Sequence, residues 1–166
     1  MELKLNLDNI VLIGFMGSGK STIGRRLAKE IDYFFLDTDN LIENFENMRI
    51  SDIFKKYGEE YFRNKEKYCV SWLKNVKKSV ISTGGGMPIF VPSIKEVGKI
   101  VYLKVDFDTI VSRLDKEEIK KRPLFKDIKK AKELFYTRDK IYSNLADLTI
   151  NNNDIDFTIS KIKEML

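Results

Sequence analysis

The chain has 166 residues, of which 43% are hydrophobic and 33% charged, with a formal net charge of +5. This length suits a single domain with a sizeable core, and no apolar run approaches the ~20 residues of a membrane span. The chain contains no histidine, which excludes Ser-His and Cys-His catalysis and His-ligated zinc and leaves acid or base chemistry to carboxylates, lysine or tyrosine.

A glycine-rich loop follows the first predicted strand. Residues 10–13 form a short apolar run typical of a buried strand, and Gly14-Phe15-Met16-Gly17-Ser18-Gly19-Lys20-Ser21 comes directly after it. Apolar residues then recur up to residue 31 at the spacing of one helix face. Strand, loop and helix are the context of the phosphate-binding motif G-x-x-x-x-G-K-[ST]. The alternative is a glycine turn that only joins the two elements.

The phosphate-binding interpretation assigns a role to several groups of this loop. Glycines let consecutive backbone N–H groups face one point, and the N-terminus of the following helix adds a positive dipole end. Lys20 would reach the β and γ phosphates, and the Ser21 hydroxyl would bind magnesium.

A pair of carboxylates follows the second predicted strand. Residues 33–36 are apolar and aromatic and end in Asp37-Thr38-Asp39. One carboxylate would hold the coordination shell of a magnesium ion, and the other would contact a hydroxyl group of the substrate. The alternative is helix capping by Asp39 or Asn40, since Asn40 with Glu43 fits a capping box.

Three glycines follow the third predicted strand. Helical stretches are predicted over residues 40–45, 51–57 and 59–76, with a break at Gly58, and a strand over 79–82 leads into Thr83-Gly84-Gly85-Gly86. A turn that needs one residue with positive φ rarely needs three glycines, so this loop allows backbone to lie against a ligand. A flexible turn is the alternative.

The remaining elements continue the alternation of strands and helices. We predict a strand over residues 99–105, a helix over 106–114, a charged mobile excursion over 115–127, a helix over 128–145, a strand over 148–150 and a closing amphipathic helix from residue 155. Short apolar strands alternating with helices indicate a parallel sheet covered on both sides, with ligands at the carboxyl ends of the strands.

Isolated arginines suggest anion contacts. Arg63 and Glu66 are spaced so that the glutamate can orient the arginine on a helix, although exposed pairs of this spacing are common. Lys120-Lys121-Arg122-Pro123-Leu124 puts a guanidinium in the predicted excursion, where closure could bring it to a transferring phosphoryl group. An ordinary charged loop is the alternative.

The combined motifs resemble those of shikimate kinases over essentially the whole chain. The features that carry the resemblance are the Gly14 to Ser21 loop, Asp37-Thr38-Asp39, Phe62-Arg63 with Glu66, Gly84-Gly85-Gly86, Arg122-Pro123-Leu124 and Arg138. The chain departs from the family at Met87-Pro88, at Arg138-Asp139-Lys140-Ile141-Tyr142, which lacks a proline, and at the phenylalanine that follows Leu124.

The resemblance implies a fold and a reaction. The fold is an α/β, three-layer α/β/α P-loop NTPase fold like that of nucleoside monophosphate kinases, with a five-stranded parallel sheet. Residues 1–166 form one domain, with a substrate-binding helical region at about 39–76 and a mobile lid at about 115–127. The reaction moves the γ-phosphate of ATP to the 3-hydroxyl of shikimate with Mg²⁺, in aromatic amino-acid biosynthesis.

The resemblance also implies the site residues. The catalytic ones are Lys20, Asp39 and Arg122, and Ser21 with Asp37 belongs to the metal site, Asp37 usually through water. Those for ATP are Gly14, Gly17, Ser18, Gly19, Lys20, Ser21, Thr22, Arg113 and Arg122. Those for shikimate are Asp39, Arg63, Gly84, Gly85, Gly86 and Arg138.

Other functions remain alternatives to this one. A gluconate or nucleoside monophosphate kinase of the same fold is the nearest alternative, and the chain lacks suitably placed GTPase motifs. Scattered lysines favour small anions over nucleic acid. With one cysteine, Cys69, and no secretory signal at residues 1–4, we expect a cytoplasmic monomer without a membrane partner.

Overall fold

The computed structural model describes residues 8–166 of the chain. The expectation that the chain begins without a secretory signal concerns residues 1–4, which lie outside the described residues. Among the helices that are described, none combines the length and the apolar character needed to cross a membrane.

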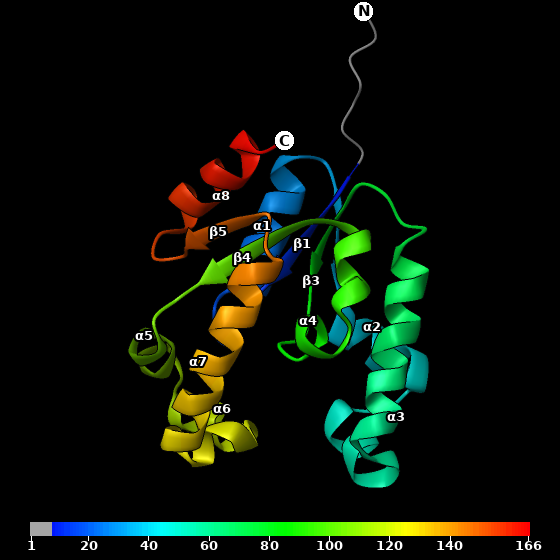
Figure 1. Ribbon diagram of the computed structural model, residues 1–166, viewed down its shortest axis with the longest axis vertical. Coiled ribbons are helices and arrows are strands. Elements are labelled where there is room, and N and C mark those ends of the chain that lie inside the picture. The colour runs from blue at the N-terminus through cyan, green and yellow to red at the C-terminus, as the bar shows by residue number, and fades with distance from the viewer. Residues whose placement is uncertain (1–7) are drawn as a thin grey trace, which may run out of the picture.

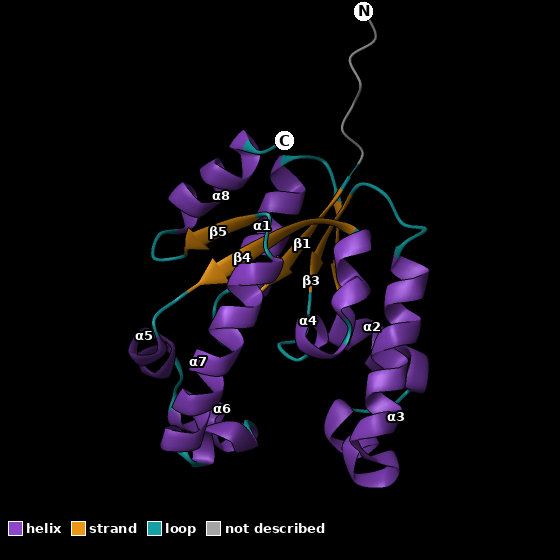
Figure 2. Ribbon diagram, in the orientation of Figure 1, coloured by secondary structure: helices purple, strands orange, loops and turns teal. Residues whose placement is uncertain are grey.

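Five parallel strands form one sheet in the order β2-β3-β1-β4-β5 (Figure 2). The strands are β1 (Asn9–Ile13), β2 (Phe34–Asp37), β3 (Ser79–Ser82), β4 (Gly98–Lys104) and β5 (Leu148–Asn151). β1 lies at the centre, and its Val11 pairs with Ile81 of β3 and Ile100 of β4. Because a central parallel strand is covered on both faces, residues 10–13 of β1 are all apolar. The predicted five-stranded parallel sheet is confirmed.

Helices cover both faces of this sheet (Figure 1). Along the chain they are α1 (Lys20–Glu30), α2 (Thr38–Glu46), α3 (Ile50–Leu73), α4 (Met87–Phe90), the 3₁₀ turn η1 (Pro92–Glu96), α5 (Phe107–Arg113), α6 (Lys116–Lys121), the 3₁₀ turn η2 (Pro123–Lys126), α7 (Ile128–Leu145) and α8 (Ile155–Glu164). One apolar cluster joins α1 and α8 to the sheet, and a larger one joins the opposite face to α3, α4 and α7. The architecture is therefore the predicted three-layer α/β/α arrangement.

Several helix boundaries differ from the sequence-based prediction. The break predicted at Gly58 is confirmed, since that residue has φ 82° and ψ 174° inside α3. The helix predicted to reach residue 76 ends at Leu73. The excursion predicted over residues 115–127 contains helical structure, α6 followed by η2, and α4 with η1 was not predicted from the sequence at all.

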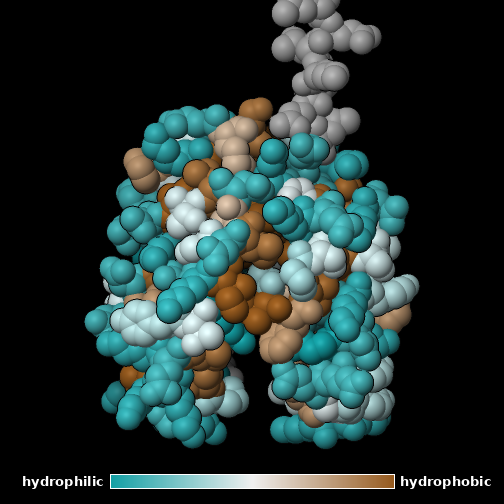
Figure 3. All heavy atoms as spheres, viewed as in Figure 1, coloured by the Kyte–Doolittle hydropathy of each residue, from teal (hydrophilic) through white to brown (hydrophobic). Residues whose placement is uncertain are grey.

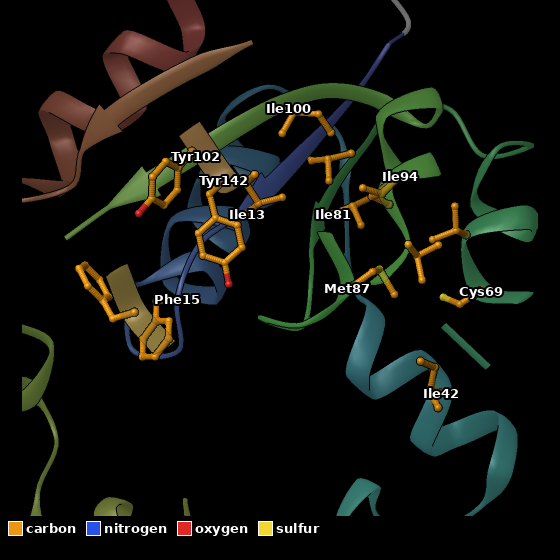
Figure 4. Close-up of a cluster of buried hydrophobic side chains, with 14 of the residues drawn as sticks. Ile13, Phe15, Ile42, Cys69, Ile81, Met87, Ile94, Ile100, Tyr102 and Tyr142 are labelled. Atoms are coloured by element: carbon orange, nitrogen blue, oxygen red, sulfur yellow. The ribbon is translucent and has the colours of Figure 1, made fainter. Parts of the chain in front are cut away.

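The larger apolar cluster contains two tyrosines besides aliphatic side chains. Figure 4 shows Tyr102 of β4 and Tyr142 of α7 close together, on the same side of the sheet as Ile13 and Phe15. Their ring centroids are 5.2 Å apart. Cys69 belongs to the same cluster, where burial raises the pKa of its thiol to about 12. A thiol with so high a pKa stays protonated at neutral pH, which is typical of a structural cysteine and not of a nucleophile.

The carboxyl ends of the strands share one edge of the sheet. Below this edge the molecule is split by a notch between the lobe of α6 with the lower part of α7 and the lobe of α3 (Figure 3). A cavity of about 780 Å³ opens at this edge and is lined by residues that follow β1, β2, β3 and β5. Parallel topology thus brings the loops singled out in the sequence to one place.

Candidate active site

The loop between β1 and α1 has the backbone of a phosphate-binding loop. Gly17 and Gly19 have φ values of 80° and 92°, in the left-handed region that favours glycine. A Cβ on Gly19, the residue before α1, would come within 2.9 Å of Asn152 Nδ2. The backbone therefore enters the N-terminus of α1 through Gly19, a position that has no room for a side chain.

Lys20 is curled into this loop. Its Nζ donates to the carbonyl oxygens of Gly14 at 2.8 Å and Phe15 at 3.0 Å. Burial lowers its pKa to about 8, against the effects of Asp39 and Asp37. The ammonium group therefore remains largely charged at neutral pH, beside the backbone that faces the cavity.

Asn152 supports the loop from the opposite side. Its Nδ2 donates to Ser18 O at 2.7 Å, and its Oδ1 accepts from Thr158 at 2.9 Å. Arg113 donates to the Asn152 carbonyl oxygen at 3.2 Å and also lines the cavity. Asn152 was missed from the sequence, although its position directly after a parallel strand was a usable signal.

Asp37 caps the helix that carries Asp39. Its Oδ1 accepts from the backbone N–H groups of Asp39 at 3.0 Å and Asn40 at 3.1 Å. Its other oxygen lies 3.4 Å from Ser21 Oγ, which donates to it. The alternative that Asp39 or Asn40 caps this helix is therefore wrong, because the helix begins earlier, at Thr38.

Asp39 is free of the capping role and faces the triple-glycine loop. A Cβ on Gly84 would come within 2.5 Å of Asp39 Oδ1, so only glycine leaves room for the carboxylate. Burial, then the charges of Asp37 and Glu66, raises the pKa of Asp39 to about 6. Asp39 is thus ionised at neutral pH and close to the range in which a carboxylate exchanges protons.

Arg63 is held in a fixed orientation beside Gly86. Its NH1 donates to Glu66 at 2.8 Å, and its Nε and NH2 donate to Glu59 at 3.2 and 3.1 Å. The guanidinium lies 3.9 Å from the centre of the Phe90 ring. A Cβ on Gly86 would come within 2.7 Å of NH1. The predicted Arg63 and Glu66 pair is real and largely buried, with side-chain exposures of 16% and 1%.

Arg138 approaches the same loop from α7. Its NH1 lies 3.5 Å from the position of a Cβ on Gly85. Its charge also acts on Glu66. Burial raises the pKa of Glu66 above its usual value, and the charges of Arg63 and Arg138 offset part of that increase. Arg63, which pairs with Glu59 and Glu66, and Arg138 therefore flank the triple glycine, and their remaining N–H groups suit an anionic group.

Arg122 reaches back from the segment between α6 and η2 toward the phosphate loop. Its NH1 lies 3.8 Å from the position of a Cβ on Gly17. That nitrogen is buried and makes no hydrogen bond within the described part of the chain. A buried polar group without a partner costs roughly 1–3 kcal/mol, so the arrangement favours an anion at this point.

The cavity brings together most, but not all, of the residues expected at the site. Those that line it are Gly17, Gly19, Lys20, Ser21, Thr22, Asp37, Asp39, Gly84, Gly85, Arg113 and Arg122. Those expected at the site that do not line it are Gly14, Ser18, Arg63, Gly86 and Arg138. The phosphate loop and Asp39 thus share one cavity, and the two arginines lie beyond its wall at the triple glycine.

Comparison with known proteins shows the family to which the chain is similar. A family model described as shikimate kinase matches residues 16–166. A shikimate kinase of Clostridium botulinum is 45% identical over 152 residues, 89% of each chain, and one of Helicobacter hepaticus is 46% identical over 148 residues, 89% of this chain and 88% of the other. The structure of shikimate kinase from Acinetobacter baumannii in complex with shikimate has a TM-score of 0.85 at 34% identity, over 96% of this chain and 93% of that one. With the resemblance of its motifs confirmed over nearly its whole length, the chain belongs to the shikimate kinase family.

Proposed function

We propose that this protein transfers the γ-phosphate of ATP to the 3-hydroxyl of shikimate, giving ADP and shikimate 3-phosphate for aromatic amino-acid biosynthesis. The family makes the chain a phosphotransferase that acts on an alcohol group. One observation carries the assignment of its substrates: a phosphate loop and a partly buried carboxylate, Asp39, line a single cavity, and two arginines flank the glycine loop beside that carboxylate.

The donor side of the site would hold the triphosphate. The backbone of Gly14 to Ser21 would surround the β and γ phosphates, with Lys20 moving from the loop carbonyl oxygens to the phosphate oxygens. Thr22 lines the cavity, and Arg113 beside Asn152 would pack against the adenine. Arg122 would neutralise the charge that develops on the transferred group.

The acceptor side would hold a small hydroxylated acid. Arg63 keeps two of its five N–H groups after its bonds to Glu59 and Glu66, and these with Arg138 would bind the carboxylate of shikimate. Gly84, Gly85 and Gly86 would lie against the ring. Asp39 would accept the hydrogen of the 3-hydroxyl as that oxygen attacks the γ-phosphorus and the bond to ADP breaks.

The residues near Ser21 fit a magnesium ion. Asp37 caps α2 with one oxygen and directs the other toward the Ser21 hydroxyl, a pairing of hard oxygen ligands. Among residues 8–166 no group of three or more acidic, cysteine or histidine side chains forms a metal site, so water and phosphate oxygens would complete the shell, with Asp37 acting through water. When bound, Mg²⁺ would screen the phosphate charge.

We further propose that residues 1–166 work as one domain and as a monomer in the cytoplasm, without nucleic acid or membrane partners. The helical region of residues 39–76, which contains α2 and α3, would bind the acceptor, and the segment 115–127, which contains Arg122, would act as the lid. Support comes from the single cysteine and from the scattered lysines.

A coupled assay of ADP release tests the proposed function. Shikimate, gluconate and adenosine monophosphate would be compared as acceptors at equal concentration with ATP and Mg²⁺. We expect ADP release with shikimate and not with the other two acceptors. The Lys20→Met variant is the background control and should release no ADP with any of them. Turnover with only the nucleotide or only gluconate would contradict the proposal.

A further inference from the structure

Tyr142 joins the core of the protein to the triple-glycine loop. Tyr142 belongs to α7, and its ring is fully buried in the core close to that of Tyr102 (Figure 4). Its hydroxyl donates a hydrogen bond of 2.5 Å to the carbonyl oxygen of Gly85. Neither the family comparison nor the proposed roles of the arginines gives this hydroxyl a function.

A glycine loop needs such external contacts because it has no side chains of its own. Gly84 is tied by its N–H, which donates to Thr38 Oγ1 at 3.0 Å, and by its carbonyl oxygen, which accepts from Met87 N at 3.2 Å. At Gly85 the corresponding bond is the one from Tyr142. Glycine has more freedom to lose than any other residue, so each of these bonds restricts the loop strongly.

The bond to Gly85 also fixes the direction of the next N–H group. In a trans peptide the carbonyl oxygen and the following N–H point in opposite directions in one plane. Since the Gly85 oxygen points to Tyr142, the Gly86 N–H points away from Tyr142 and the core. The Arg63 guanidinium also contacts Gly86, at the position that a Cβ would occupy.

The same hydroxyl lies beside Arg138. The two residues are one turn apart on α7, which puts them on the same helix face. A Cβ on Gly85 would lie 3.5 Å from Arg138 NH1 and 3.6 Å from the Tyr142 hydroxyl, so both groups touch one point of the loop. The hydroxyl and the guanidinium therefore lie beside the same glycine, and a side-chain hydrogen bond joins Arg138 to Tyr142.

We propose that Tyr142 is a positioning residue for the acceptor: its hydroxyl holds the Gly85–Gly86 peptide and the Arg138 guanidinium in the relative orientation that binds the carboxylate and ring of shikimate. This inference rests on the proposed function, because it concerns the same acceptor. Tyr142 itself need not touch the acceptor.

The hydroxyl keeps its proton over the range in which the enzyme would be assayed. Burial raises the pKa of Tyr142 to about 12, against a smaller opposite effect of Arg138. It therefore acts as a constant donor to Gly85 and takes no part in proton transfer.

Tyr142→Phe tests this role, with Tyr102→Phe as the matched control. Each substitution removes one buried hydroxyl and keeps the ring, and the Tyr102 hydroxyl donates to Asp139 at 2.7 Å rather than to the loop. We expect Tyr142→Phe to raise the KM for shikimate about 5- to 10-fold, the effect of one buried hydrogen bond, and to leave the KM for ATP within about twofold. Calorimetric binding of shikimate without ATP should weaken by the same factor.

The control separates positioning from general loss of stability. Both variants should show similar small decreases in melting temperature, and Tyr102→Phe should keep the KM for shikimate near the wild-type value. An unchanged KM in Tyr142→Phe, or an equal rise in both variants, would overturn the inference. Absence of shikimate turnover in the wild type would instead refute the proposed function, so the two failures are distinguishable.

Discussion

Asp37 Oδ1 accepts a hydrogen bond from the backbone N–H of Asp39 at 3.0 Å, so the first carboxylate of the pair orients the helix turn that carries the second. Asp37 remains near Ser21 and the phosphate loop, whereas Asp39 faces Gly84. The two side chains therefore face different parts of one cavity. In the proposed mechanism Asp37 would serve metal binding and Asp39 would contact the acceptor hydroxyl, although the two residues are only two apart in the sequence.

Replacing Asp39 by asparagine should lower kcat by about 10²- to 10⁴-fold, the usual contribution of a positioned proton acceptor. Asp52→Asn is the matched control, because Asp52 also lies in the first turn of a helix but is exposed. Steady-state rates with saturating ATP and shikimate would measure both. Wild-type turnover in a folded Asp39→Asn variant would contradict the role of Asp39.

The same substitution should stabilise the protein without substrates. Folding raises the pKa of Asp39 from 3.8 to about 6, so its charged form destabilises the fold at neutral pH by roughly 3 kcal/mol. This penalty is fully present above about pH 6, where Asp39 is ionised in both states, and absent below about pH 4, where Asp39 is protonated and uncharged in both states. Urea unfolding of Asp39→Asn and wild type should differ at pH 7.5 and converge at low pH. A constant difference across pH would contradict the assignment.

The pH dependence of activity should reflect Asp39 and Lys20 on opposite sides of neutrality. Asp39 must be ionised to accept a proton and has a pKa raised to about 6, so kcat/KM for shikimate should fall as the pH decreases through that value. Lys20 must be charged and has a pKa lowered to about 8, so kcat/KM for ATP should fall above it. Rates with excess coupling enzymes would measure both limbs. An acid limb that persists unchanged in residual activity of Asp39→Asn would argue against Asp39 as its origin.

The sequence predicted the strands and the loops at their ends well, because these depend on local patterns. The apolar run before Gly14 is typical of a buried strand, and the spacing of the glycines that follow is typical of a phosphate-binding loop. Parallel topology then required the loops after β1, β2 and β3 to share an edge. Gly58 was recognised as a break for the same local reason.

The parts that were missed depend on contacts between distant segments. The sequence left open whether Asp39 caps α2, and the answer depends on where β2 ends, since strand pairing extends to Asp37. Asn152 is 134 residues from Ser18, the loop residue that it supports. The hydrogen bond from Tyr142 to Gly85 spans 57 residues and has no signature in either segment.

Gly84→Ala should inactivate the protein although it adds only one methyl group. The added Cβ would come within 2.5 Å of Asp39 Oδ1 and would displace the carboxylate. Gly58→Ala is the informative control, because Gly58 has open space around it but φ 82° and ψ 174°, a conformation adopted almost only by glycine, so it should lower stability by about 1–3 kcal/mol and retain activity. Circular dichroism melts and ADP release would separate the two effects. An active Gly84→Ala variant would show that Asp39 does not need its observed position.

Arg63→Lys should weaken shikimate binding about 10-fold or more and leave ATP binding within about threefold, because lysine keeps the charge but loses the planar fork that binds a carboxylate with two parallel hydrogen bonds. Lysine is preferred to alanine here, since removing the charge would leave the buried Glu66 without its 2.8 Å partner and would confuse binding with stability. Arg49→Lys provides the control: Arg49 also pairs with a glutamate, at 3.6 Å, but its side chain is 80% exposed, and Arg49 is not among the individual residues proposed to contact shikimate. Calorimetric titrations with shikimate and, separately, with a non-hydrolysable ATP analogue would measure both affinities. A larger loss for the nucleotide than for shikimate would place Arg63 on the donor side and would contradict the carboxylate-binding role.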